Sequence, residues 1–264
     1  MADSTETRKE RRASAREERG RAAAAQARRR QRLWILGGAL ALAAAIVVVI
    51  AIAAGGNNST KLKQGEVIPG QAEATALFAG IPQNGITLGD PRSPVTFVEF
   101  ADLQCPFCRE YTAQVMTTLV NQYVRTGKMK MQFRNVAFIG TDSARAAQMA
   151  AAAGRQNRLW PYVDIFYTNQ QQENSGYVTD DFLRRIGAGV KGLDVEKAMS
   201  DRGLPEVQRQ LNDAQTEWQT NGFTGTPSFL VGPTGGRLAA LDVRSFDPGT
   251  FTSAIDKVLA QQGR

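Results

Sequence analysis

Apolar side chains follow three different patterns along the chain. From Leu33 to Ala54 they run for 22 residues without a charged side chain. Residues 55–84 shift to Gly, Asn, Gln, Ser, Thr and Pro, which is typical of a linker with some local docking. Beyond Asp90, apolar stretches of strand length alternate with stripes at helical spacing. The pattern therefore predicts a membrane segment, a linker and one compact domain.

The uninterrupted apolar stretch, residues 33–54, predicts a transmembrane helix. At 1.5 Å per residue it forms a helix about 33 Å long, which is enough to span a bilayer. A cleaved signal peptide is the alternative, because Ala51–Ala53 offers small residues at a cleavage site. Arg28–Arg30 and Arg32 precede the stretch, so the positive-inside rule places the N-terminus in the cytoplasm and the rest of the chain outside.

Positive charge is concentrated in residues 1–32. They hold 11 of the 32 Lys and Arg residues and 5 of the 25 acidic residues, whereas residues 33–264 hold 21 basic and 20 acidic residues. The net charge of +7 therefore describes one end of the chain and indicates no nucleic-acid surface on the domain. With almost no large apolar side chains, residues 1–32 are predicted to be a basic cytoplasmic tail without a core of its own.

The domain begins with a β-rich apolar stretch at Val95–Phe100. A helix is predicted from Pro106 to Gly127, because apolar residues recur every four positions between a proline in the first turn and a C-terminal glycine. A second strand is predicted within Lys128–Phe138, and residues 81–88 are a candidate edge strand. Helices are then expected at 143–153, 159–169, 179–186, 194–200 and 205–220, with Thr179 and Asp194 as N-caps.

The C-terminal part predicts two short strands and a helix. Ser228–Val231 and Arg237–Leu241 flank a Pro-Thr-Gly-Gly turn, and Asp247-Pro248 begins a last helix. The order is β-α-β, then helices, then β-β-α. An α/β domain is expected, with a helical insertion at about 141–221.

Cys105 and Cys108 are the only cysteines of the chain, and they lie where a strand leads into a helix. Their separation allows a disulfide, and the helix N-terminus lowers the pKa of the first thiol through its N–H groups and dipole. An oxidised pair can then accept attack by a substrate thiolate at Cys105, with Cys108 as the leaving group. The reverse sequence reduces a disulfide.

Three other interpretations of the cysteine pair are weaker. A structural disulfide across so small a loop removes little chain entropy. A structural zinc site needs two further ligands, and the chain contains no His. An inert thiol pair is unexpected in an oxidising compartment. The absence of His also argues against hydrolase chemistry, and no phosphate-binding loop, dinucleotide fingerprint or metal-ligand cluster is present, so no cofactor is expected.

Three stretches of the sequence together resemble the DsbA-like thioredoxin-fold family, especially its membrane-anchored Gram-positive and actinobacterial-type members. They are Val95–Phe100 with the following Cys-Pro-Phe-Cys, Leu159–Phe166, and Phe223–Phe229. The resemblance extends from about Gly85 to the C-terminus. It implies that residues 85–264 form a thioredoxin-like domain with the helical insertion.

The resemblance also implies roles for single residues. Cys105 would be the nucleophile and Cys108 the resolving cysteine, while Thr226 and Pro227, joined by a cis peptide, would face the disulfide and bind substrate through the backbone. An ordinary trans proline that starts a strand is the alternative for Pro227. Glu99 matches a buried acid that assists proton transfer for Cys108, and an acid that faces solvent from an edge strand is the alternative.

Phe107 departs from the family pattern, because strongly oxidising relatives carry a His between the two cysteines. The loss of an imidazolium beside the thiolate predicts a less oxidising pair. The ring of Phe107 either enlarges the apolar surface that binds unfolded substrates or packs in the core face of the helix. Trp160 and Trp218 are expected in core or interdomain packing.

The predicted function is an extracytoplasmic thiol–disulfide oxidoreductase that forms disulfides in secreted proteins. As the resemblance implies, unfolded or reduced secreted proteins are its substrates, and a quinone-linked membrane oxidase of the DsbB or vitamin K epoxide reductase-like kind reoxidises it. A reductase or isomerase of the same fold is the first alternative. A non-catalytic, membrane-anchored binding or chaperone module is the second.

Overall fold

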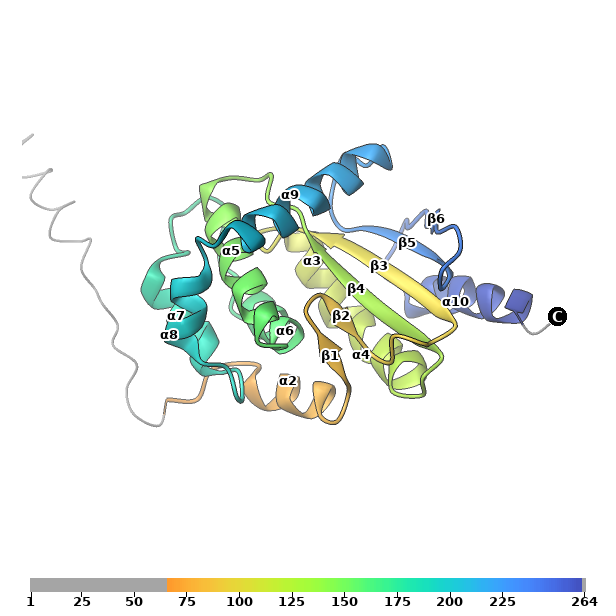
Figure 1. Cartoon of the computed structure of the whole chain (residues 1–264), viewed down its shortest axis with the longest axis horizontal. Helices are drawn as coiled ribbons and strands as arrows, with labels where there is room; N and C mark the ends of the chain where they lie inside the picture. Colours follow the sequence, from red (N-terminus) through yellow and green to blue (C-terminus); the bar gives the residue numbers. More distant parts are fainter. Residues whose placement is uncertain (1–65, 263–264) are drawn as a thin grey trace, which may run out of the picture. The chain divides into compact units, whose positions relative to one another are not determined.

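A mixed β-sheet organises the part of the chain that the computed structural model describes, residues 66–262 (Figure 1). β3 pairs in parallel with β4 and antiparallel with β5. The arrangement agrees with the predicted thioredoxin-like α/β fold. In the sheet order β1-β2-β4-β3-β5-β6, the strands are β1 (Gln83–Asn84), β2 (Thr87–Leu88), β4 (Met129–Asn135), β3 (Val95–Ala101), β5 (Ser228–Pro233) and β6 (Ala239–Ala240).

The central strand β3 is buried along its whole length. Phe97 and Ala101 belong to the main core on one face of the sheet, and Val98 and Phe100 belong to a second cluster on the other face. A strand that is covered on both faces needs apolar side chains at nearly every position. This explains the uninterrupted apolar stretch, in which Glu99 is the one charged residue.

The predicted edge strand at residues 81–88 is a hairpin of two very short strands. β1 pairs with β2, and β2 pairs antiparallel with β4, so the hairpin extends the sheet beyond β4. Gly85 lies at the turn with a φ of 57°, a conformation that glycine adopts at no steric cost. At the opposite edge, only Ala239–Ala240 of the predicted strand 237–241 pairs with β5.

The helix that begins after Cys105 is continuous but irregular. α3 (Pro106–Tyr111) and α4 (Thr117–Leu119) alternate with two π-helical turns, Thr112–Met116 and Val120–Val124. Its start at Pro106 is confirmed, whereas the π-helical turns were not predicted. A last helix, α10 (Pro248–Gln262), begins at the predicted residue and buries Phe251 and Ile255 in the main core.

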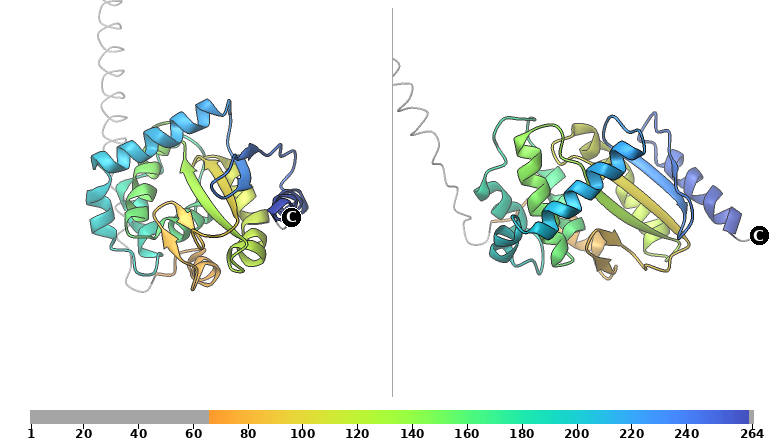
Figure 2. Two further views of the ribbon diagram at one scale, coloured as in Figure 1. Left: turned by 45° about the vertical axis from the view of Figure 1, so that its right-hand side comes forward. Right: turned by 45° about the horizontal axis from the view of Figure 1, so that its top comes forward.

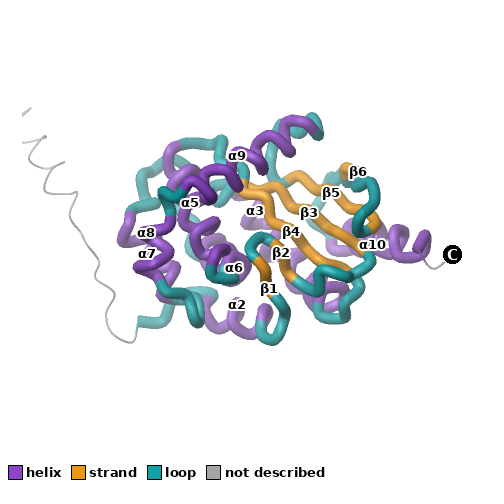
Figure 3. Tube along the Cα trace, in the orientation of Figure 1, coloured by secondary structure: helices purple, strands orange, loops and turns teal. Residues whose placement is uncertain are grey.

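Five helices fill the interval between β4 and β5, as predicted. Figure 3 shows them gathered at one end of the sheet, with α9 reaching back along it. The side chains of Thr179 and Asp194 accept N–H groups in the first turns of α7 and α8, which confirms both N-caps. The helices are α5 (Thr141–Arg155), α6 (Leu159–Thr168), α7 (Asp180–Ala188), α8 (Val195–Asp201) and α9 (Pro205–Thr220).

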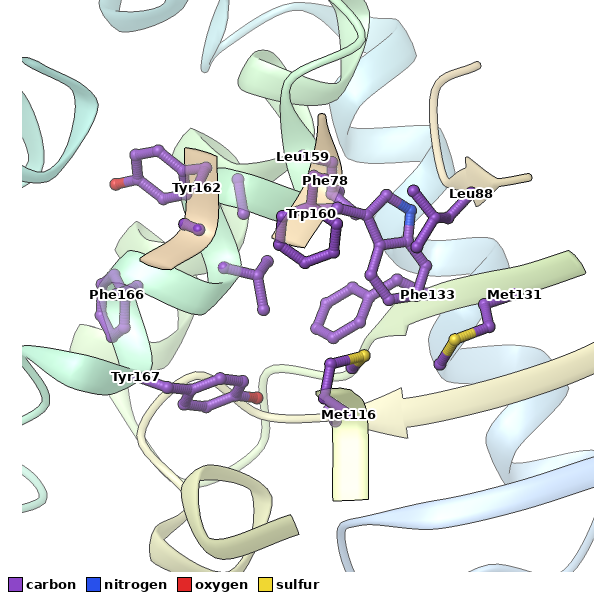
Figure 4. Packing of buried hydrophobic residues seen from close by; sticks show 14 of the residues in the cluster. Phe78, Leu88, Met116, Met131, Phe133, Leu159, Trp160, Tyr162, Phe166 and Tyr167 are labelled. Atoms are coloured by element: carbon purple, nitrogen blue, oxygen red, sulfur yellow. The ribbon is translucent and has the colours of Figure 1, made fainter. Parts of the chain in front are cut away.

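The insertion and the sheet share one hydrophobic core. Figure 4 shows Trp160 of α6 beside Phe133 of β4, with ring centroids 5.9 Å apart and nearly perpendicular planes. Trp218 of α9 packs in the second cluster on the other face of the sheet, where its ring stacks on Phe138. The two turned views of Figure 2 show α9 alongside the strands. Both tryptophans therefore serve in packing, as expected.

The linker predicted at residues 55–84 is corrected by the structure in its described part. α2 (Gln71–Phe78) lies within it, and Ala74 and Phe78 of this helix are buried in the main core together with Ile68. The segment was predicted as a linker from its content of Gly, Asn, Gln, Ser, Thr and Pro, and α2 has almost no amphipathic pattern that would indicate a helix. The packed domain therefore begins upstream of the predicted boundary at residue 85.

The predicted transmembrane helix, residues 33–54, and the predicted tail, residues 1–32, lie outside the described residues. Among residues 66–262, none of the helices combines the length and the apolar character that crossing a membrane requires.

Phe78→Ala tests whether α2 is part of the folded domain. Because the Phe78 side chain is only 6% exposed, its truncation leaves a cavity, and we expect the free energy of unfolding to fall by about 3–4 kcal/mol in urea titrations. Val67→Ala is the matched control, since Val67 is 78% exposed and its truncation is expected to change stability by less than about 0.5 kcal/mol. Equal, small effects of both variants would show that α2 contributes nothing to the core.

Candidate active site

The two cysteines lie at the N-terminus of α3 in unequal environments. Cys105 is the N-cap residue, with extended backbone angles, and Cys108 is in the first turn of the helix. Both are free thiols. Cys105 retains 4% of its surface, whereas Cys108 is completely buried. The first sulfur is therefore the one that a substrate can reach.

Cys105 is the acidic thiol of the pair. Its pKa is lowered to about 6, chiefly by the hydrogen bond that the Cys108 thiol donates to its sulfur. The Thr226 side chain and the backbone N–H groups of Cys108 and Phe107 lower the pKa further, and partial burial opposes them. These N–H groups point along the helix axis at its N-terminus, as the sequence predicted.

Cys108 has the opposite character. Burial raises its pKa well above the usual range of a thiol, and the hydrogen bond with Cys105 acts in the same direction. At neutral pH the reduced site therefore holds a thiolate at Cys105 and a protonated thiol at Cys108. This division of roles is the one that thiol–disulfide exchange requires.

The loop at Thr226 and Pro227 faces Cys105, and the peptide bond between the two residues is cis, as expected. The Cys105 thiol donates a hydrogen bond to the backbone oxygen of Thr226 over 3.2 Å. On the far side of the loop, Trp218 Nε1 and Ser228 Oγ both donate to the backbone oxygen of Gly225, at 3.2 and 2.6 Å. The packing tryptophan of α9 thus also holds the loop, a contact that sequence reasoning missed.

Glu99 lies in the middle of β3, near enough to Cys108 for its charge to raise the pKa of that thiol. It is completely buried, and the sheet register places it between Phe133 of β4 and Phe229 of β5. Neither carboxyl oxygen has a hydrogen-bond partner among the described residues. Burial raises the pKa of Glu99 to about 8. The alternative of a solvent-facing acid on an edge strand is therefore wrong.

Tyr111 completes this buried cluster and was not predicted as a site residue. Its hydroxyl is buried and has no partner within residues 66–262, and its ring lies 4.7 Å, centroid to centroid, from that of Phe229. Burial raises the pKa of Tyr111, and the negative charges of Glu99 and Cys108 raise it further. Its position three residues after Cys108, on the same helix face, was the available signal.

A second group of buried polar residues fixes the turn that carries Cys105. Asp102 accepts the N–H of Gln104 through one carboxylate oxygen and those of Phe138 and Ile139 through the other. Gln170 of the helical insertion donates to the backbone oxygens of Leu103 and Cys105. Neither Asp102 nor Gln170 was predicted as a site residue, because no local sequence pattern links either of them to the cysteines.

Phe107 is exposed on the surface of the site. Its side chain retains 60% of its surface, so the alternative of a core position is wrong. It lines a groove of about 820 Å³ that also contacts Thr226, Pro227 and Phe246. Phe107 therefore presents an apolar surface next to the reactive sulfur.

Comparison with known proteins shows the family to which the chain belongs. Residues 82–240, more than half of the chain, match the family model described as Thioredoxin. The chain is also 32% identical over 176 residues to "Probable disulfide bond formation protein D" of Bacillus cereus, across 66% of this chain and 78% of that protein. The chain belongs to the thioredoxin family, in its DsbA-like branch. The resemblance inferred from the sequence is thereby confirmed.

Solved structures agree with the thioredoxin-like fold. The oxidised form of BdbD from Bacillus subtilis superposes with a TM-score of 0.58 at 21% identity, covering 68% of this chain and 97% of that one. A thioredoxin-like oxidoreductase from Silicibacter pomeroyi superposes with a TM-score of 0.53 at 28% identity, covering 71% and 97%. Family membership, together with one thiol that keeps a little accessible surface and one that is completely buried, makes this DsbA-like chain a protein thiol–disulfide oxidoreductase.

The lowered pKa of Cys105 predicts how fast the reduced protein reacts with iodoacetamide. Because the thiolate is the nucleophile, the alkylation rate should rise with pH around a midpoint near 6, against about 8.5 for an ordinary thiol. Mass spectrometry of samples quenched between pH 4 and 9 measures this midpoint. Cys108→Ala removes the largest cause and should raise the midpoint. A wild-type midpoint near 8.5 would contradict the assignment of Cys105 as the acidic thiol.

The raised pKa of Glu99 predicts a pH-dependent stability of the disulfide form, in which the cysteines do not titrate. Between about pH 5 and 8 this carboxyl has already lost its proton in the unfolded chain, whereas the folded protein keeps it. The free energy of unfolding should therefore fall as pH rises, by up to about 1.4 kcal/mol per pH unit from this group. The carboxyl contributes no further slope above about pH 8.

Glu99→Gln is nearly isosteric and cannot ionise. Urea titrations at several pH values should show that the free energy of unfolding of this variant rises relative to that of the wild type from pH 5 to 8. Asp213→Asn, at an exposed position of α9, is the matched control and should follow the wild type. Parallel stability curves for Glu99→Gln and wild type would rule out a carboxyl that is neutral at pH 7.

Proposed function

We propose that the chain forms disulfide bonds in reduced secreted proteins outside the cytoplasm. The observation that carries the proposal is the unequal burial of the two sulfurs, with Cys105 reachable against the Thr226 backbone and Cys108 sealed beneath it. Glu99, Phe107, Thr226 and Pro227 are proposed as the residues that assist the two cysteines.

The reaction proceeds in two exchanges. A substrate thiolate attacks Cys105 Sγ of the oxidised site, a substrate–Cys105 disulfide forms, and the Cys105–Cys108 bond breaks with its electron pair on Cys108. Cys108 then takes up a proton, for which the buried carboxyl of Glu99, neutral below about pH 8, is the neighbouring donor. A second substrate thiolate attacks the substrate sulfur and releases Cys105 as a thiolate. Two substrate thiols have then become one disulfide, and the protein holds their two electrons.

The backbone around Pro227 suits an extended substrate. Pro227 has no N–H, and the Thr226 oxygen already points at the reactive sulfur. A polypeptide lying along this loop therefore meets Cys105 through backbone contacts that do not depend on its sequence. Phe107 adds apolar surface for an unfolded chain. Such a site suits reduced proteins in general rather than one particular partner.

The electrostatics of the site favour electron acceptance. A thiolate that is stabilised at Cys105 stabilises the reduced form of the protein above about pH 6, and this makes the disulfide form the stronger oxidant. The name of the Bacillus cereus relative, a probable disulfide bond formation protein, supports the same direction. The second candidate is a reductase or isomerase, and Phe107 favours it, because an imidazolium at this position would have lowered the pKa of Cys105 further.

The location and the reoxidising partner rest on the sequence and the resemblance. The apolar stretch 33–54 and the arginines that precede it support a single-pass anchor with a cytoplasmic N-terminus and the domain outside. A domain held at the membrane is well placed to pass its electrons to a quinone-linked membrane oxidase. No bound cofactor is proposed, since both redox groups are side chains.

Equilibration with glutathione buffers tests the direction of electron flow. We expect a reduction potential between those of thioredoxin, about −270 mV, and DsbA, about −120 mV, and above about −200 mV. The fraction of reduced protein is read by mass spectrometry after alkylation. Phe107→His should raise the potential further, because it places a cation beside the thiolate. A wild-type value near −270 mV would replace the oxidase by the reductase.

Cys108→Ala tests whether substrates pass through Cys105. Without the resolving thiol, mixed disulfides with secreted proteins should accumulate on Cys105 in intact cells, visible as reducible high-mass species on non-reducing gels. The double variant Cys105→Ala with Cys108→Ala is the matched control and should give none. If the single variant also gave none, the non-catalytic binding module would become the better description.

A further inference from the structure

A second groove lies on the other side of the exposed first turn of α3. We call it the α2–α6 groove; it has a volume of about 1020 Å³, larger than the groove beside Pro227. Phe107 and Glu110 line both grooves and so form the ridge between them. The residues that line the α2–α6 groove and are used below are Glu73, Leu77, Phe107, Arg109, Glu110 and Asp164.

The groove depends on helix α2, which forms its outer wall. Arg125 holds the C-terminal end of this helix by donating to the backbone oxygens of Leu77 and Ala79, at 2.7 and 2.9 Å. Asn169, after α6, donates to the backbone oxygen of Pro69 just before the helix. α2 precedes the residues that match the family model, 82–240. The wall therefore adds a surface to the thioredoxin core.

The lining combines apolar surface with an excess of negative charge. Leu77 and Phe107 contribute apolar area, whereas Glu73, Glu110 and Asp164 contribute three carboxylates against the single cation of Arg109. The ion pairs formed within residues 66–262 include none of these four charged groups. A cationic ligand would therefore not have to break an existing ion pair.

Asp164 is the groove carboxylate whose negative charge is disfavoured by burial. It is half-buried, and burial raises its pKa to about 6, with a further contribution from the charge of Glu73. A cation placed between these two carboxylates would relieve both causes, since it supplies the missing opposite charge and separates two like charges. An anionic ligand would instead add a further negative charge beside Asp164 and Glu73.

We propose that the α2–α6 groove binds the part of a substrate polypeptide adjacent to its reactive cysteine, and selects segments that carry Lys or Arg. The proposal rests on the proposed function. An extended chain advances about 3.3 Å per residue, so a few residues beyond the substrate cysteine suffice to cross the Phe107 ridge from Cys105. Apolar atoms of a Lys or Arg stem would pack on Leu77 and Phe107, with the charged end at Glu73 and Asp164.

The test measures how fast peptides with a single cysteine form a mixed disulfide with the oxidised full-length protein. Three peptides differ only in two residues placed three and four positions from the cysteine, which are both Lys, both Gln or both Glu. At low ionic strength we expect the Lys peptide to react about five-fold faster than the Gln peptide and the Glu peptide to react more slowly than both. Added salt should reduce these ratios.

The double variant Glu73→Gln with Asp164→Asn should bring the Lys-to-Gln rate ratio close to one. The ratio is taken within each protein, so a general loss of activity cancels. The matched control carries Glu206→Gln and Asp213→Asn, which remove the same two charges from α9 at a different groove. This control should retain the five-fold ratio. A ratio that persists in the groove variant, or equal rates for the three peptides on the wild type, would overturn the proposal.

The neutral small thiol 2-mercaptoethanol separates this proposal from the proposed function. It is too small to reach from Cys105 into the groove and has no charge to select. If it reduces the wild-type disulfide while the three peptides react equally, the groove proposal fails and the oxidoreductase assignment stands. If neither it nor any peptide reacts, the proposed function itself fails.

Discussion

The unequal solvation of two sulfurs one helical turn apart is the constraint on which the site depends. Cys108 is sealed in the core and its pKa is raised, so at neutral pH it stays protonated and donates a hydrogen bond to the Cys105 sulfur. The same hydrogen bond is the largest cause of the low pKa of Cys105. Burial of one thiol thus creates the reactivity of the other, and the helix N-terminus adds to this effect.

The sheet supplies the surroundings that this arrangement requires. β3 is covered on both faces and ends at Ala101, one turn before Cys105. The pairing of the strand places Glu99 between Phe133 and Phe229. The cost of burying its charge keeps the carboxyl neutral, so that a proton is stored beneath Cys108 without an adjacent cation. The Tyr111 hydroxyl is buried in the same region. The core therefore holds a neutral acid near the cysteines, as the proposed proton transfer to Cys108 requires.

The elements outside the central sheet determine how the site meets its substrate. The helical insertion contributes Gln170, which holds the turn that carries Cys105, and Trp218, which holds the loop before Pro227. Helix α2 adds a wall on the other side and creates the α2–α6 groove. The reactive pair thus lies between two grooves of different character, and Phe107 is the apolar ridge that separates them.

The sequence by itself determined the order of elements, the cysteine pair at a helix start and the candidate loop at Pro227, because these depend on periodicity and on local backbone preferences. It indicated that Glu99 was unusual but left two environments open, and only the pairing of β3 with strands on both sides decided for burial. Helix α2 was missed because its stability comes from packing by Phe78 and Ile68 rather than from its own pattern. The shared burial of Tyr111 and Glu99, the hydrogen bonds from Gln170 and the carboxylates of the α2–α6 groove bring together residues that are far apart in the chain. Such contacts are set by tertiary packing, and local sequence patterns carry no information about them.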